Sequence, residues 1–231
     1  MDPTTARQRS CLLRLRARGE LACFTRPELK VERVSYPVMT PSAARGILEA
    51  VLWKPAITWR VERITLLKPI KFTAFRRNEV NSKAPAPAAA TIKSGGAAPV
   101  LYADEDRAQR NTVALSDVDY VIEARFVMTD RAGPEDNVRK FEEMFERRVA
   151  QGQHFHQPYF GCREFIAAIE PAPAQVTPEN DSRDLGIMLW DIAFGGKSGN
   201  AARFFAAKLE NGVLNVPENP EATLVASGAV I

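Results

Sequence analysis

The sequence predicts an α+β fold, and three observations support this class. The first two thirds of the chain alternate strand-like and helix-like periodicities in the order βαββαβ, with one interruption rich in alanine, proline and glycine. The last third carries strand patterns alone. With 231 residues, 45% of them hydrophobic, the chain is long enough to bury one large core or two small ones.

The first element is a strand over residues 11–18, because apolar and basic residues alternate there. Leucine and alanine lie on one side of this strand and arginine alone on the other. The sequence therefore predicts a half-buried strand with a basic outer face, formed by Arg14, Arg16 and Arg18.

A helix follows, with Thr40 as its N-cap and Pro41 at its first position, and it ends before Pro55. Apolar residues recur at helical spacing between these points, so one stripe of the helix should pack on a sheet. Two strands come next, at residues 57–67 and 68–75, each with an apolar residue at every second position.

Residues 78–117 break the pattern. They begin as a low-complexity stretch and continue into a charged segment at 102–111 that permits a short polar helix. Because the alanine-, proline- and glycine-rich half can bury little apolar surface, we expect an insertion outside the core.

Regular structure resumes with a strand at 119–128 and a helix over 137–150, and residues 151–165 then lead into a further strand. The βαββαβ order predicts a ferredoxin-like (RRM-like) N-terminal domain over residues 1–165, interrupted by the insertion at 78–117.

The strand patterns of residues 166–231 predict a smaller C-terminal antiparallel β-sheet domain, with Asn211-Gly212 as a hairpin turn. The string GGKSG at 195–199 imitates the end of a phosphate-binding P-loop. That motif needs glycine where Asp191 stands, and strands follow instead of a helix, so the sequence favours a plain loop.

Composition excludes several classes of protein. Cys11, Cys23 and Cys162 are too few and too scattered for a disulfide framework or a four-ligand zinc site, and they are typical of free thiols in a reducing cytoplasm. Arginines interrupt the N-terminus where a signal peptide would be apolar, and no stretch approaches the roughly 18 apolar residues of a membrane span. We expect a cytoplasmic protein without membrane contact, metal or cofactor.

Charge is divided unequally along the chain. Residues 1–80 hold 16 Lys and Arg against 7 Asp and Glu, a balance of +9, which leaves −6 for residues 81–231. This segregation favours a polyanionic partner for the first half, although a solvated basic face is the simpler alternative.

The two histidines, His154 and His156, are spaced so that an extended segment would point both to one face. They suit an acid/base pair, metal ligands, RNA contact or a structural role. The neighbouring helix carries basic residues that either are solvated or contact phosphates beside the aromatic side chains of 155–160. These basic residues are Arg139, Lys140, Arg147 and Arg148.

Several strings, in the same order along the chain, resemble those of the d-type CRISPR-associated family-five proteins of subtype I-C. They are FTRPELKVERVSYPVMTPSAARGILEAVLWKPAITW, ITLLKPIKF, RRNEV and EEMFERRVAQGQHFHQPYFGCREF. The resemblance covers most of residues 20–166 outside the insertion, while the C-terminal part is matched mainly in its hairpin pattern. It implies an RRM-like domain and a smaller β-sheet domain, in agreement with the periodicity.

The resemblance also implies a reaction and partners. The d-type protein cuts the repeat of precursor CRISPR RNA without metal: a ribose 2′-OH attacks the scissile phosphate and leaves a 2′,3′-cyclic phosphate and a 5′-OH. Such a reaction needs a base, a cation for the developing phosphorane charge and an acid. The protein then stays with the other subunits of the surveillance complex.

In the family pattern a tyrosine precedes W-K-P, and a Lys-His pair lies at the start of the second helix. These positions are Leu52, Lys140 and Phe141 here, so only the lysine is retained. The resemblance therefore assigns phosphorane stabilisation to Lys140. Three other groups are candidates for proton transfer: Tyr36, His154 and His156.

Two alternatives to the endoribonuclease remain at this point: a non-catalytic subunit that caps the 5′ handle of the guide RNA, and a generic nucleic-acid binder that also holds duplex DNA. The expected partners are CRISPR repeat RNA, duplex DNA and other complex subunits. The candidate RNA-binding residues are Arg14, Arg16, Arg26, Lys30, Arg33, Arg45, Arg139, Arg147 and Arg148.

Overall fold

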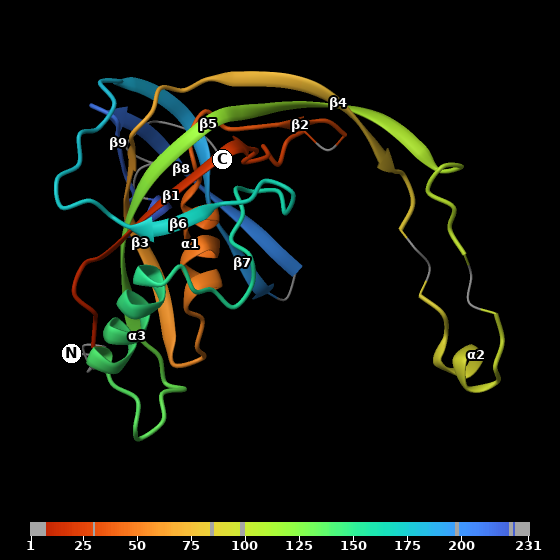
Figure 1. Ribbon diagram of the computed structural model, residues 1–231, viewed down its shortest axis with the longest axis horizontal. Helices are drawn as coiled ribbons and strands as arrows, with labels where there is room; N and C mark the ends of the chain where they lie inside the picture. Colours follow the sequence, from red (N-terminus) through yellow and green to blue (C-terminus); the bar gives the residue numbers. More distant parts are fainter. Residues whose placement is uncertain are drawn as a thin grey trace.

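The computed structural model describes residues 8–29, 31–83, 86–97, 100–196, 199–221 and 224. It is a mixed α/β fold dominated by one mainly antiparallel sheet (Figure 1). In chain order its elements are β1 (Leu13–Ala22), β2 (Arg33–Val34), α1 (Pro41–Val51), β3 (Ile57–Leu66), β4 (Phe72–Val80), α2 (Ala89–Lys93), β5 (Arg107–Met128), α3 (Val138–Ala150), β6 (Ala168–Pro171), β7 (Arg183–Gly196), β8 (Gly199–Glu210) and β9 (Val213–Asn215).

The sheet runs in the order β6-β1-β5-β3-β9-β8-β7, and β2 and β4 pair with β5 off this path. Helix α1 contacts both β3 and β7, so the sheet curls around this helix, while α3 packs against β1 and β6. The chain beyond residue 165 contributes to the same sheet, because β6 pairs with β1 and β9 pairs with β3. The division into two domains at that residue stays a prediction.

Local signals in the sequence are confirmed. Strand β1 buries Leu13, Leu15 and Ala17 as its alternation predicts. At the start of α1 the Thr40 hydroxyl accepts a hydrogen bond from the amide of Ala43 at 3.3 Å, which satisfies one free donor of the first turn. The turn between β8 and β9 is Asn211-Gly212.

Both residues of that turn have positive φ, 48° and 73°, the conformation that favours an Asn-Gly pair. The P-loop imitation lies between two strands, since β7 ends at Gly196 and β8 begins at Gly199, with Lys197 and Ser198 outside the described residues. The strand after it is not the helix that a P-loop requires.

The prediction for residues 78–117 is partly wrong. The polar helix predicted at 102–111 does not form there; residues 107–117 belong to the long strand β5, and β4 pairs with β5 from Phe72–Leu115 to Val80–Arg107. The two strands arch away from the body and carry the short helix α2 at their far end (Figure 1). Within the described part of the chain, no helix is long and apolar enough to cross a membrane.

Candidate nucleic-acid interface

The arginine face of β1 exists, but acidic groups from neighbouring strands occupy it. Arg16 makes two hydrogen bonds to Asp119, at 2.9 and 2.6 Å, and a third to Glu170 at 2.7 Å. Arg14 lies 3.1 Å from Glu123, which β5 places opposite it. The hydrogen bond with Asp119 is the largest cause that raises the pKa of Arg16 above its ordinary value. The predicted basic outer face is therefore present but carries ion-paired arginines, and their contact with RNA stays a prediction.

Three other predicted RNA-binding arginines also have partners within the protein. Arg26 pairs with Glu28 at 3.4 Å, and its guanidinium lies 4.8 Å from the ring centre of Tyr36. Arg33 donates to Glu79 at 2.9 Å, and Arg45 lies 2.7 Å from both Glu49 and Asp191. Lys30, predicted as a further contact, lies outside the described residues. The first half of the chain therefore offers much less free positive charge than its composition suggests.

Tyr36 is a poor candidate for a general base in this structure. Its side chain is 1% exposed, and burial is the main cause that raises its pKa above the ordinary value, which disfavours the phenolate. The two positions where the family pattern has tyrosine and histidine are also in the core: Leu52 is fully buried, and the Phe141 ring packs edge-on against Phe126 at 6.2 Å.

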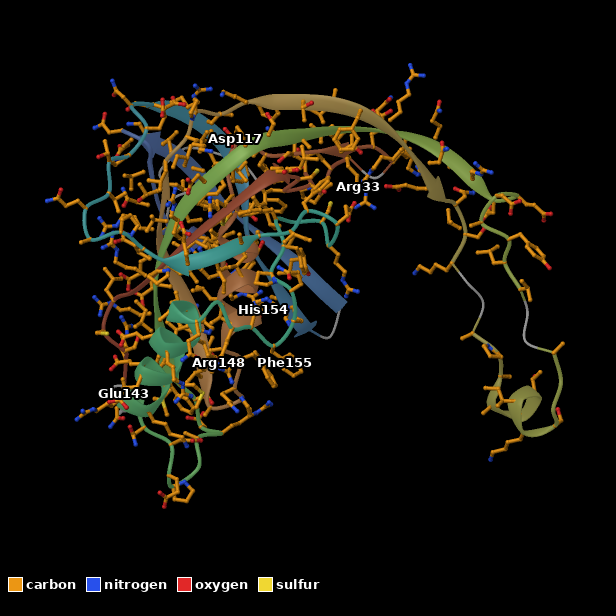
Figure 2. The ribbon with its side chains drawn as sticks, viewed as in Figure 1. Arg33, Asp117, Glu143, Arg148, His154 and Phe155 are labelled. Atoms are coloured by element: carbon orange, nitrogen blue, oxygen red, sulfur yellow. The ribbon has the colours of Figure 1, made fainter. Side chains whose placement is uncertain are left out.

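An open cavity of about 490 Å³ lies where the loop after α3 passes the end of α1. Arg148 donates to the carbonyl of Val51 at 2.6 Å, and the amide of Phe155 donates to the carbonyl of Ala50 at 2.8 Å. These two bonds satisfy carbonyls of the last turn of α1 and fix the loop beside it. Arg148, His154 and Phe155 come together there, as Figure 2 shows.

The aromatic ring of Phe155 is 88% exposed, so its amide is anchored while its side chain is presented to solvent. Trp53, two residues after the end of α1, is also exposed, at 61%. Large exposed rings beside cations are suited to base stacking. The sequence patterns assigned no role to Trp53; the signal available was an aromatic residue next to the Lys54-Pro55 helix stop.

The two histidines do not lie on a strand, the extended backbone on which their spacing would give them one shared face. Residues 151–158 form a turn and bends, without the strand that would alternate their side chains. Both histidines are exposed, but only His154 lines the cavity, and the ring of His156 lies edge-on to Phe155 at 6.2 Å. The cavity thus holds one imidazole.

Lys140 lies in the first turn of α3, where Asn137 caps the helix by accepting from the Lys140 amide at 3.0 Å. Its ammonium group is 2.9 Å from Asp136, and this hydrogen bond is the main cause of the lowered pKa of Asp136. Eight residues of helix, about 12 Å of rise, separate Lys140 from Arg148. The structure therefore does not bring Lys140 and His154 to one point.

Two cations complete the outer surface of α3. Arg139 is 87% exposed and bonds to Glu143 at 2.8 Å within the helix. Arg147 is exposed and forms no ion pair with another described residue. Helical periodicity places it, seven residues after Lys140, on the same face. Lys140 and Arg147 therefore share one side of α3, and Arg148 leads to the cavity at the end of this helix. We refer to Lys140, Arg147, Arg148, His154 and Phe155 together as the α3 surface.

An antiparallel sheet with helices on one face, beside a surface of exposed cations and aromatic rings, is typical of RNA-binding proteins. Comparison with known proteins narrows this class. The chain belongs to the CRISPR-associated protein family Cas_Cas5, of the Cas5d type, whose pattern matches residues 12–217.

Two relatives share the name CRISPR pre-crRNA endoribonuclease Cas5d. The one from Mannheimia succiniciproducens is 49% identical over 214 residues, covering 89% of this chain and 94% of the relative. The one from Thermus thermophilus is 41% identical over 222 residues, covering 89% and 91%. A solved structure described as a CRISPR-associated protein has the same fold, with a TM-score of 0.67 over 94% of this chain and 96% of that one, at 21% identity.

Proposed function

We propose that this chain is an endoribonuclease that cuts CRISPR repeat RNA without metal and then stays, with its product, in the subtype I-C surveillance complex. The names of the two curated relatives support the reaction. The observation in the structure that carries the proposal is the α3 surface, where Arg148 and His154 line an open cavity beside the exposed ring of Phe155.

In this proposal the ribose 2′-OH attacks the adjacent phosphate. His154 is exposed, but about 12 Å of helix separates its end of the α3 surface from Lys140, so it contacts the RNA beside the scissile phosphate and not the phosphorane that Lys140 stabilises. Lys140 stabilises the charge that develops on the phosphorane, and Arg147 and Arg148 hold flanking phosphates. Because about 12 Å of helix separates the ends of this surface, the RNA must run along α3, and the scissile phosphate lies nearer to one end.

The finer description of the fold belongs to the same proposal. If β1, β3, β5 and β6 are numbered one to four, their order in the sheet is 4-1-3-2, with α1 and α3 as the two crossovers. This arrangement supports a ferredoxin-like (RRM-like) core whose second and third strands extend into the β4–β5 arm.

A second candidate is a non-catalytic subunit that caps the 5′ handle. The burial of Leu52 and Phe141, where the family pattern has proton-transfer groups, favours it. Non-specific binding of duplex DNA loses its main support, since Arg14 and Arg16 are engaged in ion pairs.

Incubation of the purified protein with end-labelled repeat RNA in EDTA separates the two candidates. One discrete product, absent when the nucleotide upstream of the scissile bond is 2′-deoxy, supports the nuclease. Retarded but intact RNA supports the cap, and activity that EDTA abolishes and magnesium restores contradicts the metal-independent reaction.

A further inference from the structure

A second cavity, of about 310 Å³, lies on another part of the molecule, between the first turns of α1, strand β3, strand β7 and the segment after β9. Its apolar walls are two tryptophans, two prolines and three valines, and its charged lining has four arginines and three carboxylates. The volume is near the lower limit for organic-ligand pockets, about 300 Å³. A single nucleotide is a ligand of that scale.

Three of the four arginines are neutralised by carboxylates of the same lining. Arg9 pairs with Glu218 at 2.8 Å, Arg45 with Asp191 at 2.7 Å, and Arg125 with Glu62 at 3.0 Å. Arg60 is exposed and forms no ion pair within the described part of the chain. The cavity therefore has one positive charge without a partner.

The position of Arg60 adds a second reason to expect an anion. It lies directly opposite Arg125 in the β3–β5 pair, and like charges at opposed positions destabilise a sheet. Glu62 and the carbonyl of Ser10 already hold the Arg125 guanidinium, so Arg60 is the cation left to hold a phosphate. The register shift between Val61 and Arg63 lies next to the pair, and such irregularities commonly re-aim side chains beside binding sites.

The walls suit a flat aromatic ring. Trp190 is half-buried, donates its indole N–H to the carbonyl of Pro217 at 3.1 Å, and has the guanidinium of Arg203 at 5.0 Å from its ring centre. These contacts fix the orientation of the indole. Strand β9 pairs with β3 from Arg63 to Thr65, and the amide of Val216 continues this contact by donating to the carbonyl of Glu62 at 2.9 Å. Among the described strands, residues 57–61 on this edge of β3 have no strand partner and are left for hydrogen bonds to a base.

We propose that this cavity binds one unpaired nucleotide of the bound RNA, with its base against Trp190 and its phosphate on Arg60. This inference rests on the proposed function only in taking RNA as the ligand. The site shares no residue with the α3 surface, so it is a separate contact that selects RNA with an unpaired nucleotide at a fixed distance from the cleavage point.

The test uses the full chain and uncleavable repeat RNA that is 2′-deoxy at the scissile position. Trp190→Leu should raise the Kd roughly 5- to 100-fold, the range for loss of one base stack. Arg60→Gln should raise it about 3- to 10-fold and reduce the salt slope by about 0.7, as for one phosphate contact to a single strand. Tyr102→Leu and Arg76→Gln, exposed residues of the arm, are the matched controls and should leave the Kd within about twofold of the wild type.

Replacing unpaired nucleotides one at a time by abasic residues should identify a single position whose loss reproduces the effect of Trp190→Leu and is not additive with it. Thermal unfolding of each variant checks folding, and the exposed Arg60 keeps the test valid if Trp190→Leu is unstable. Titration of the protein with adenosine or uridine 5′-monophosphate, followed by tryptophan fluorescence, tests whether the cavity binds a free nucleotide instead of a nucleotide within RNA.

Normal RNA binding by both variants overturns the proposal, as does tight binding of a free monophosphate without any effect on RNA. Cleavage by the same preparations separates the two hypotheses. If the wild-type protein does not cut RNA but the variants bind it more weakly, the pocket is supported and the nuclease is contradicted. If the wild-type protein cuts RNA and the variants bind it normally, only the pocket is contradicted.

Discussion

The outer face of β1 and the α3 surface both carry several cations, which alternate along the strand and cluster on the helix. The groups that contact these cations differ between the two regions. On β1, Arg16 is held by Asp119 and Glu170, and Arg14 by Glu123. On α3, Arg147 has no anionic partner among the described residues, and Arg148 bonds to a backbone carbonyl that carries only partial charge. The first region uses its arginines to join strands, whereas the second leaves Arg147 available to a ligand, although Lys140 is paired with Asp136.

The difference shows that the positive charge of a sequence indicates its capacity to bind an anion only after the cations that pair with carboxylates within the protein are subtracted. Asp119 is 3% exposed, and a buried carboxylate needs its partner to remain charged. Substitutions on the two surfaces should therefore affect different quantities: stability for β1, and RNA binding or cleavage for α3.

The largest expected effect is on catalysis. Lys140→Ala should lower the single-turnover cleavage rate by roughly 10²-fold or more while RNA affinity changes little, because a group used mainly in the transition state contributes little to ground-state binding. Rapid-quench measurements with repeat RNA give the rate, and Lys208→Ala, an exposed lysine of β8, is the control. An equal loss of rate and affinity would make Lys140 a positioning contact instead.

Arg16→Gln should lower the free energy of unfolding by about 2–3 kcal/mol, since it leaves the carboxylate of Asp119 buried without its partner; the partial exposure of Arg16 keeps the loss at the low end for buried pairs. Urea unfolding measures the change. Arg18→Gln, which removes a more exposed group 3.6 Å from Glu170, should cost less than about 0.5 kcal/mol. The comparison fails if Arg16→Gln weakens RNA binding by folded protein as strongly as substitutions on α3.

Arg147→Gln should raise the Kd for repeat RNA about threefold and reduce the salt slope by about 0.7, whereas Arg14→Gln should change neither. Titrations from low to high salt with both variants measure this difference directly. An equal reduction of the salt slope in the two variants would mean that the ion pair between Arg14 and Glu123 opens when RNA binds.

The smallest effect concerns the arm. Replacing residues 81–106 by a short Gly/Ser linker should change the free energy of unfolding by less than about 1 kcal/mol, because none of the described residues of this segment belongs to the core. Thermal unfolding of the shortened chain provides the measurement. A larger replacement that includes residues 107–115 should be disruptive, since Ala114 and Leu115 are buried, and it serves as the contrasting variant.

Local features of the fold were accessible from the sequence. Thr40 and Asn211-Gly212 predicted a helix start and a hairpin because their signals involve residues adjacent in the chain. The ion pair between Arg16 and Asp119 joins residues 103 positions apart, and neither strand's pattern indicates the identity of the group opposite it. The burial of Tyr36 likewise depends on packing that no local pattern records.

The cavity beside α3 could be predicted only in part, because only some of its contacts join residues that are close in the chain. A basic helix followed by histidines and aromatic residues predicted Arg148 and His154 near one another, because they are close in the chain. Their anchor is the end of α1, about 100 residues earlier, where Val51 accepts from Arg148. Sequence spacing cannot supply such a contact, and it also misjudged the loop, because histidines at alternate positions share a face only on extended backbone.

The pairing of β9 with β3 has a consequence for synthesis of the protein in the cell. Thr65 is opposite Val213, so one edge of β3 is completed only when the end of the chain has been made. At about 5–20 residues per second, that edge waits on the order of ten seconds while the intervening segments form. Nascent chains that stop before residue 213 should therefore be cut readily by protease near β3, and full-length chains should become resistant soon after release.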